Sequence, residues 1–98
     1  IDHTRVTGNN GGGIKLNHHA FASLGDGTVV SSNSGPGLEV RNASMAVAPN
    51  PPQTGEVSGN NWNNGDLVCD SISHINNAAQ ITGAVNNNCP NLHAGDAP

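Results

Sequence analysis

The stretch VTGNNGGGIKL, Val6–Leu16, decides the fold because the chain then repeats it. It returns as VSSNSGPGLEV at Val30–Val40 and as VSGNNWNNGDLVC at Val57–Cys69. Each copy has a β-branched residue, a turn rich in Asn and Gly, and a short segment of alternating apolar residues. The valines that open the copies, and Ile81 after them, recur at intervals of roughly 24–27 residues, a period typical of a solenoid. In a solenoid each unit buries its apolar face against its neighbours.

The repeating unit is expected to consist of β-strands. No window has the i, i+3, i+4 apolar spacing of a helix, and Gly or Asn interrupts every segment. Residues two apart share one face of a strand, so each repeat directs a row of mostly small apolar side chains inward. The predicted inward set is Val6, Val30, Val57 and Ile81 on the first strands, Ile14, Leu16, Leu38, Val40, Leu67 and Cys69 on the second, and Ala20, Ala22, Leu24, Ser44, Ala46, Ala48, Ser73 and Ile75 on the third.

This pattern predicts an all-β fold, a right-handed parallel β-helix (solenoid) of about three to four coils. The coils are expected over residues 1–92, followed by a C-terminal tail at 93–98. Three strands make one coil, and successive coils pair roughly 4.8 Å apart. The right-handed winding follows the general preference of parallel crossover connections. Asn9, Asn33 and Asn60 fall at matching turns and are expected to stack as a ladder of amides.

The order of valine, Asn-rich turn, Gly-Ile/Leu-x-Leu/Val, loop and Ser/Ala-x-Ala resembles the right-handed parallel β-helix repeat proteins. That pectate-lyase-like superfamily includes carbohydrate enzymes and many secreted bacterial surface proteins. The resemblance covers about residues 3–92 and implies C-terminal coils of such a fold. It implies little about function, because one fold hosts many functions.

Composition supports a thin core and excludes several partners. The chain has 13 Gly, one Phe, one Trp and no Tyr, which suits a narrow solenoid better than a globule. A net charge of −4 with 10% charged residues makes nucleic acid an unsuitable partner. No apolar run approaches the length of about 18 residues that a membrane span requires, so none is predicted. The start at Ile1 is interpreted as processing, either removal of an export signal or, preferably, cleavage from a longer β-helix.

Cys69 and Cys89 are the only cysteines. In the repeat alignment Cys89 falls in the Ile14–Leu38–Leu67 column, one coil beyond Cys69 and shifted by two positions. A disulfide between them would close a loop of about 20 residues, contribute roughly 3 kcal/mol and staple the last coil. Two buried thiols are the alternative. The disulfide would imply an oxidising compartment, and hence an extracellular or cell-surface location.

Three features are candidate binding elements. Phe21, Met45 and His74 share one outward column, which forms either an apolar stripe for a partner or a satellite cluster under the loops. The repeat departs from its pattern at Gly59–Leu67, which is two residues longer than its equivalents and carries Trp62. The loop 49–54, stiffened by prolines, supplies the other extra length. Trp62 is expected to stack on a sugar, fill a pocket on a protein partner, or cap its own turn.

Enzymatic function finds little support in the residues. A lyase would use Arg41 as the base, flanked by Glu39 and Asp70, but no cluster of aspartates is present to bind calcium. Glycoside hydrolysis needs two carboxylates at a defined separation, and the acidic residues are scattered. The adjacent histidines His18 and His19 point to opposite sides of an extended segment, so one metal ion would rarely bind both. The sequence therefore predicts no catalytic residue, metal or cofactor.

The sequence favours a secreted, non-enzymatic structural or surface-interaction β-helix module. It would be a fragment or subunit of a larger assembly or filament, binding a protein partner or another copy through the open ends of the β-helix. The alternative is a carbohydrate-binding or polysaccharide-cleaving β-helix, with Trp62, Lys15, Glu39 and Arg41 forming its groove. A polysaccharide is thus the second candidate partner.

Overall fold

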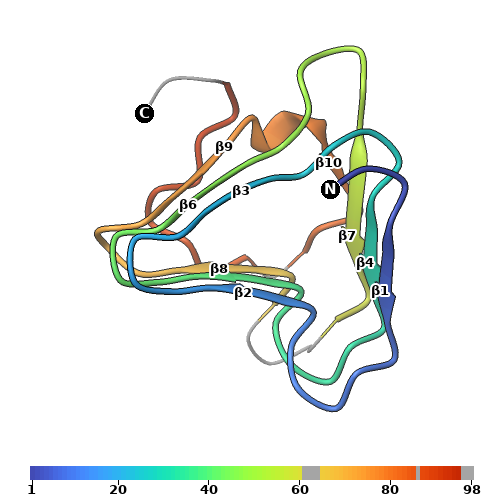
Figure 1. Cartoon of the computed structure of the whole chain (residues 1–98), viewed down its shortest axis with the longest axis horizontal. Coiled ribbons are helices and arrows are strands. Elements are labelled where there is room, and N and C mark those ends of the chain that lie inside the picture. Colours follow the sequence, from blue (N-terminus) through green and yellow to red (C-terminus); the bar gives the residue numbers. More distant parts are fainter. Residues whose placement is uncertain (61–64, 86, 96–98) are drawn as a thin grey trace.

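The computed structural model describes residues 1–60, 65–85 and 87–95 (Figure 1). This part of the chain forms ten short strands and one 3-10 turn. They are β1 Arg5–Thr7, β2 Ile14–Leu16, β3 Phe21–Ser23, β4 Val29–Ser31, β5 Leu38–Val40, β6 Met45–Val47, β7 Gly55–Ser58, β8 Leu67–Cys69, β9 His74–Asn76, η1 Ala78–Gln80 and β10 Ile81–Thr82. Strands this short are not stable alone or in isolated pairs, so each depends on pairing with strands from other parts of the chain.

The strands form three sheets in which every pair is parallel. Their orders are β1-β4-β7-β10, β2-β5-β8 and β3-β6-β9, so each strand pairs with the strand three positions later. In Figure 1 the sheets form three sides of a triangle. We call one circuit of three strands a coil: the first is β1–β3, the second β4–β6 and the third β7–β9. The predicted all-β, parallel architecture is confirmed.

The register confirms the repeat alignment through the first three coils. Val6 pairs with Val30, and Val30 pairs with Val57. Paired residues of the first two coils keep the same sequence separation, 24, on all three sheets. The separation grows to 27 between β4 and β7 and to 29 between β5 and β8. The two insertions therefore lie in the loop 49–54 and in the turn before β8, as the sequence predicts.

The core is the stack of inward side chains inside the triangle. Val30, Leu38, Val40 and Ala46 of the second coil are 0% exposed, because a coil covers them on each side. The equivalent residues of the first coil are only half-buried, since they have one neighbouring coil. Small side chains suit this interior, and serine also serves: the buried Ser44 Oγ accepts the backbone N–H of Ala20 at 3.0 Å.

The last coil differs from the sequence prediction. Ile81 pairs with Gly55 rather than Val57, because the two extra residues in the turn before β8 lengthen the third coil by the same amount. The bridge between Val68 and Asn88 sets Cys89 opposite Cys69. Cys89 therefore belongs to the Leu16–Val40–Cys69 column, two positions from the predicted one. Coil length changes here, and sequence spacing no longer fixes the register.

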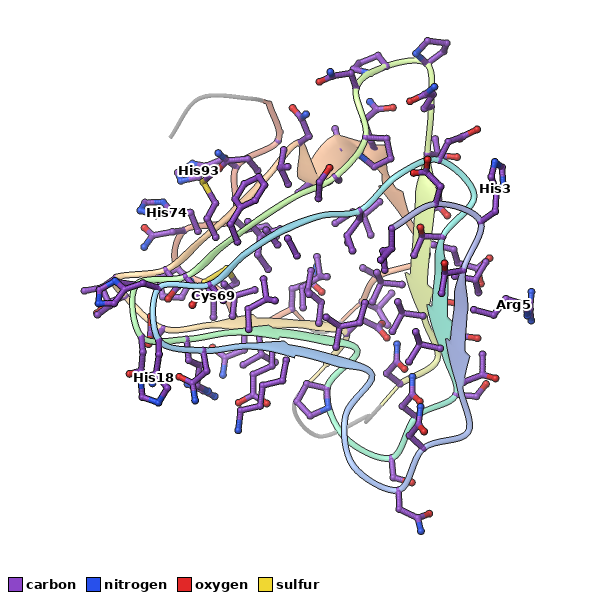
Figure 2. The ribbon with its side chains drawn as sticks, in the orientation of Figure 1. His3, Arg5, His18, Cys69, His74 and His93 are labelled. Atoms are coloured by element: carbon purple, nitrogen blue, oxygen red, sulfur yellow. A yellow bond between two sulfur atoms is a disulfide. The ribbon has the colours of Figure 1, made fainter. Side chains whose placement is uncertain are left out.

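The predicted disulfide between Cys69 and Cys89 is present, with Cα atoms 4.4 Å apart. Cys69 lies inside the ring of strands in Figure 2. The backbone N–H of Cys69 also donates to the Asn88 carbonyl at 3.0 Å. The disulfide thus joins the C-terminal segment, residues 88–95, to the third coil on the inner side of the strands.

Candidate functional site

A ladder of asparagines runs along one corner of the stack, as expected. The Asn9 Nδ2 donates to Asn33 Oδ1 at 2.9 Å, and the Asn33 Nδ2 donates to Asn60 Oδ1 at 2.8 Å. The same two oxygens accept the backbone N–H groups of Asn9 and Asn33 at 3.0 and 3.1 Å. Each side-chain oxygen thus accepts two N–H groups from the coil before it, which satisfies polar groups that the turn would otherwise bury unpaired.

Asp66 closes this ladder at its C-terminal end. Its Oδ1 accepts the backbone N–H of Asn60 at 3.0 Å and the Asn60 Nδ2 at 2.8 Å. Its Oδ2 accepts the backbone N–H of Val85 at 2.9 Å. By register Asp66 lies in the column of Gly13 and Gly37. A Cβ at Gly37 would lie 2.5 Å from Asn60 Nδ2, so the column needs glycine wherever another asparagine follows. Asp66 instead supplies the acceptor itself.

The ladder is open at its N-terminal end. Asn9 is exposed, and within the described residues its Oδ1 accepts no hydrogen bond. β1, β2 and β3 lie at the edges of their sheets. We define the N-terminal face as these three strand edges together with five residues of the first coil. They are Val6, Asn9, Ile14, Leu16 and Ala22, of which the four apolar ones are half-buried.

The outward column of Phe21, Met45 and His74 exists as predicted, across β3, β6 and β9. Phe21 is 60% exposed, while Met45 and His74 are half-buried. His93 lies opposite Asn76, beside this column, although the sequence predicted it as the start of a tail. Its backbone N–H donates to the Ile75 carbonyl at 2.9 Å, which holds it against β9. Both imidazoles lie on the outer side of the sheet in Figure 2.

Arg41 is held by charge partners on its own surface. Its Nε lies 2.5 Å from Glu39 Oε2, and the two side chains are 41% and 19% exposed. Lys15 is next to Glu39 by register. Asp70 accepts the backbone N–H of Asn42 at 2.8 Å. This bond is the largest of several causes that lower the Asp70 pKa, and the charge of Arg41 is the smallest. Arg41 is thus brought near both carboxylates, as an ion-pair partner of Glu39.

The loop 49–54 borders a hollow of about 380 Å³. Asp2, Asp26, Asn50 and Gln53 contribute to its lining. Asp26 also holds the loop, because its Oδ1 accepts the Thr54 backbone N–H at 3.2 Å. The other predicted binding element, Trp62, lies outside the described residues.

The described residues contain no group of three or more His, Cys, Asp or Glu side chains arranged to hold a metal ion. His18 and His19 are exposed, with positive φ angles of 56° and 63°. His18 projects from the outer side of its corner in Figure 2. Across the described residues no helix has the length and apolar character that crossing a bilayer requires.

No family model, curated protein or solved structure matches the chain. Function must therefore be inferred from what the chain itself presents. Within the described residues, the N-terminal face combines unpaired strand edges, half-buried apolar side chains and an amide oxygen, Asn9 Oδ1, that accepts no hydrogen bond. The stripe of Phe21, Met45 and His74 combines an exposed aromatic ring with softer side chains. The N-terminal face has the more specific chemistry, because Asn9 could accept the same kind of amide hydrogen bond that joins Asn9 to Asn33 and Asn33 to Asn60.

Proposed function

We propose that the chain is a right-handed parallel β-helix module with a structural function, and that its N-terminal face docks a further coil of the same repeat type. The three parallel sheets, the shared register of the valines and the resemblance to β-helix repeat proteins support the fold. The docking function is supported by the difference between the two ends of the stack. One end is capped by Asp66 and a disulfide-bonded segment, and the other is open.

The observation that carries the proposal is the unused acceptor on Asn9. Inside the stack, Asn33 Oδ1 and Asn60 Oδ1 each accept one backbone N–H and one side-chain N–H from the coil before. Asn9 Oδ1 can accept the same pair of donors. A partner that supplies them is a parallel coil with an asparagine at the corresponding turn. The half-buried Val6, Ile14 and Leu16 would then be covered as Val30, Leu38 and Val40 are.

A secreted location belongs to the same proposal. Disulfides persist in oxidising compartments and are rare in the cytosol. The Cys69–Cys89 bond connects the last coil to the C-terminal segment, where no further coil adds contacts within the described residues. It therefore supports an extracellular or cell-surface location for the proposed assembly.

Adding a coil tests the docking function directly. A copy of residues 6–29 inserted before Val6 keeps the period of the first two coils and places a new coil on the N-terminal face. We expect a higher urea midpoint than that of the original chain, and slower amide exchange in β1, β2 and β3, because the former edge strands become internal.

The matched control is the same insertion with its equivalents of Ile14 and Leu16 changed to serine. It has the same length and turns but a poorer inward row, so its midpoint should stay near that of the original chain. An inserted wild-type coil that leaves both midpoint and exchange unchanged would refute the docking function. Carbohydrate binding stays a prediction, because Trp62 lies outside the described residues and Arg41 is paired with Glu39.

A further inference from the structure

Two histidines that are distant in sequence meet on the outer face of β9. His74 Nδ1 and His93 Nε2 are 3.2 Å apart, so one ring donates a hydrogen bond to the other, in a direction set by the tautomers. The ring centroids are 5.4 Å apart and the ring planes differ by 21°. Both side chains are half-buried and project outward from the sheet (Figure 2). The pair lies at the surface, where an ion can reach it.

The separation of the two nitrogens fits ligation of a single metal ion. Imidazole nitrogens bind transition metals at about 2.0–2.1 Å, and two such ligands at a tetrahedral angle lie about 3.3 Å apart. The hydrogen bond between the rings already brings the nitrogens to that separation. A metal ion would replace the shared proton with little movement of either backbone, since the backbones of both residues are hydrogen-bonded in place.

A soft third ligand lies beside the pair. Met45 is directly opposite His74 in the parallel register of β6 and β9. Its Sδ lies 3.7 Å from the Nδ2 of Asn76, which is two residues after His74 and on the same face of β9. Asn76 is 5% exposed, and its Oδ1 has no hydrogen-bond partner within the described part of the chain. A flexible thioether therefore lies on the neighbouring strand opposite His74, beside an amide whose oxygen is unpaired within the described residues.

This donor set selects copper over zinc. Divalent copper has the highest affinity for nitrogen ligands in its row, and a thioether favours its monovalent form. Zinc sites use cysteine, histidine or carboxylate ligands and at least three of them. We propose that His74, His93 and Met45 form a copper site that binds Cu(I). Because His93 belongs to the C-terminal segment and Met45 to the second coil, bound copper would link that segment to β6 and β9.

The test is an anaerobic titration of the whole chain with Cu(I), in competition with a chromophoric Cu(I) chelator. We expect one ion per chain. His74→Ala and His93→Ala should each weaken binding by more than roughly 100-fold, because even the loss of an outer-shell partner of a metal ligand weakens binding about 10–100-fold. Met45→Leu keeps the side-chain volume and should weaken Cu(I) binding roughly tenfold by removing the sulfur.

The controls use the other histidines. A His3→Ala background removes an exposed histidine that lies outside the proposed site. In that background His18→Asn should leave Cu(I) affinity unchanged, since asparagine tolerates the positive φ of 56° at this position. Thermal melts of each variant show whether the fold is kept.

X-ray absorption of the wild-type Cu(I) complex gives a readout that no variant's folding can affect. We expect two nitrogen scatterers and one sulfur. A chain that binds no Cu(I), that binds it equally after His74→Ala and His93→Ala, or that binds only Zn²⁺ at these histidines would overturn the copper site. A complex without a sulfur scatterer would overturn the role of Met45.

Discussion

Asn33 is the residue on which two turns depend. It accepts two N–H groups from the first coil, and its Nδ2 donates to Asn60 Oδ1 at 2.8 Å and to the Val6 carbonyl at 3.0 Å. It is 4% exposed, and its bond to Asn60 lies in the buried interior, where water does not replace a lost partner. Asn9 occupies the same place in the repeat at the exposed end. The two asparagines therefore differ in burial and not in sequence context.

Truncating the two asparagines should reveal that difference. Asn33→Ala removes the buried hydrogen bond to Asn60 Oδ1 and three part-buried bonds to Asn9 and Val6, so we expect the unfolding free energy to fall by about 2–4 kcal/mol. Asn9→Ala affects groups that water reaches, and should cost less than about 1 kcal/mol. Urea denaturation monitored by circular dichroism measures both. Equal losses would mean that the ladder is not a buried network.

Asp70 is a charged residue whose role is to hold a corner. Its carboxylate accepts backbone N–H groups from Asn42 at 2.8 Å and from Ile72 at 3.2 Å. The Asn42 bond lowers the Asp70 pKa most, followed by the Ser73 side chain, then Ile72 and the charge of Arg41, while burial opposes the shift. The pKa is therefore lower in the folded than in the unfolded chain, and the ionised form stabilises the fold.

Acid should remove this stabilisation. It is fully present above the ordinary pKa of 3.8 and is lost as the pH falls through the lower folded pKa. Between about pH 5 and about pH 3, the urea midpoint of Asp70→Asn should therefore fall less than that of the wild type. Glu56→Gln, which removes an exposed carboxylate, is the control. The prediction fails if the wild type and Asp70→Asn show the same pH dependence.

Single strands of this chain are too short to be stable alone. Most have three residues, and an isolated pair of strands is at best marginally stable in water. Their stability comes from the neighbouring coils, so an element at the end of the stack should be weaker than its central equivalents. The segment 88–95 is such an element. It is joined to β8 and β9 by two isolated bridges and by the disulfide.

Removing the disulfide should therefore loosen one element more than the rest. The double variant Cys69→Ala and Cys89→Ala frees a loop of about 20 residues, and we expect a loss of roughly 3 kcal/mol in unfolding free energy. Amide exchange should rise first in residues 88–93, because the disulfide no longer reinforces their backbone hydrogen bonds to β8 and β9. Val40→Ala, which creates a cavity in the second coil, is the comparison and should raise exchange throughout. Uniform exchange in the disulfide variant would show that the last segment is not a separate unit.

As a whole the molecule is a short stack with two unlike ends. Its radius of gyration is 11.6 Å, close to the roughly 13 Å of a compact domain of about 100 residues, so hydrodynamic size does not distinguish it from a globule. The difference lies in its strand pairing, because each strand pairs with strands of the neighbouring coils. A capped end and an open end then give the stack a direction. The proposed docking of a further coil and the proposed copper link at the last segment belong to opposite ends.

Much of the fold and part of the candidate sites follow from the sequence. The recurring motif and the alternation of apolar residues place Val6, Val30 and Val57 in one column, and Phe21, Met45 and His74 in another. Where coil length is constant, a single register satisfies every inward position. The cysteine pair could also be proposed, because the two residues fall one coil apart.

Tertiary structure alone decided what happens where the period breaks. The two extra residues before β8 shift Ile81 to pair with Gly55, and the shorter last circuit brings His93 onto His74. Asp66 caps the ladder because no further asparagine of the described chain occupies the space beside it. These contacts involve segments that depart from the repeat within the described residues, so no repeated register determines them. Sequence repeats determine which residues pair only where consecutive copies pair with each other. At both ends of the stack the pairing is determined by tertiary contacts instead.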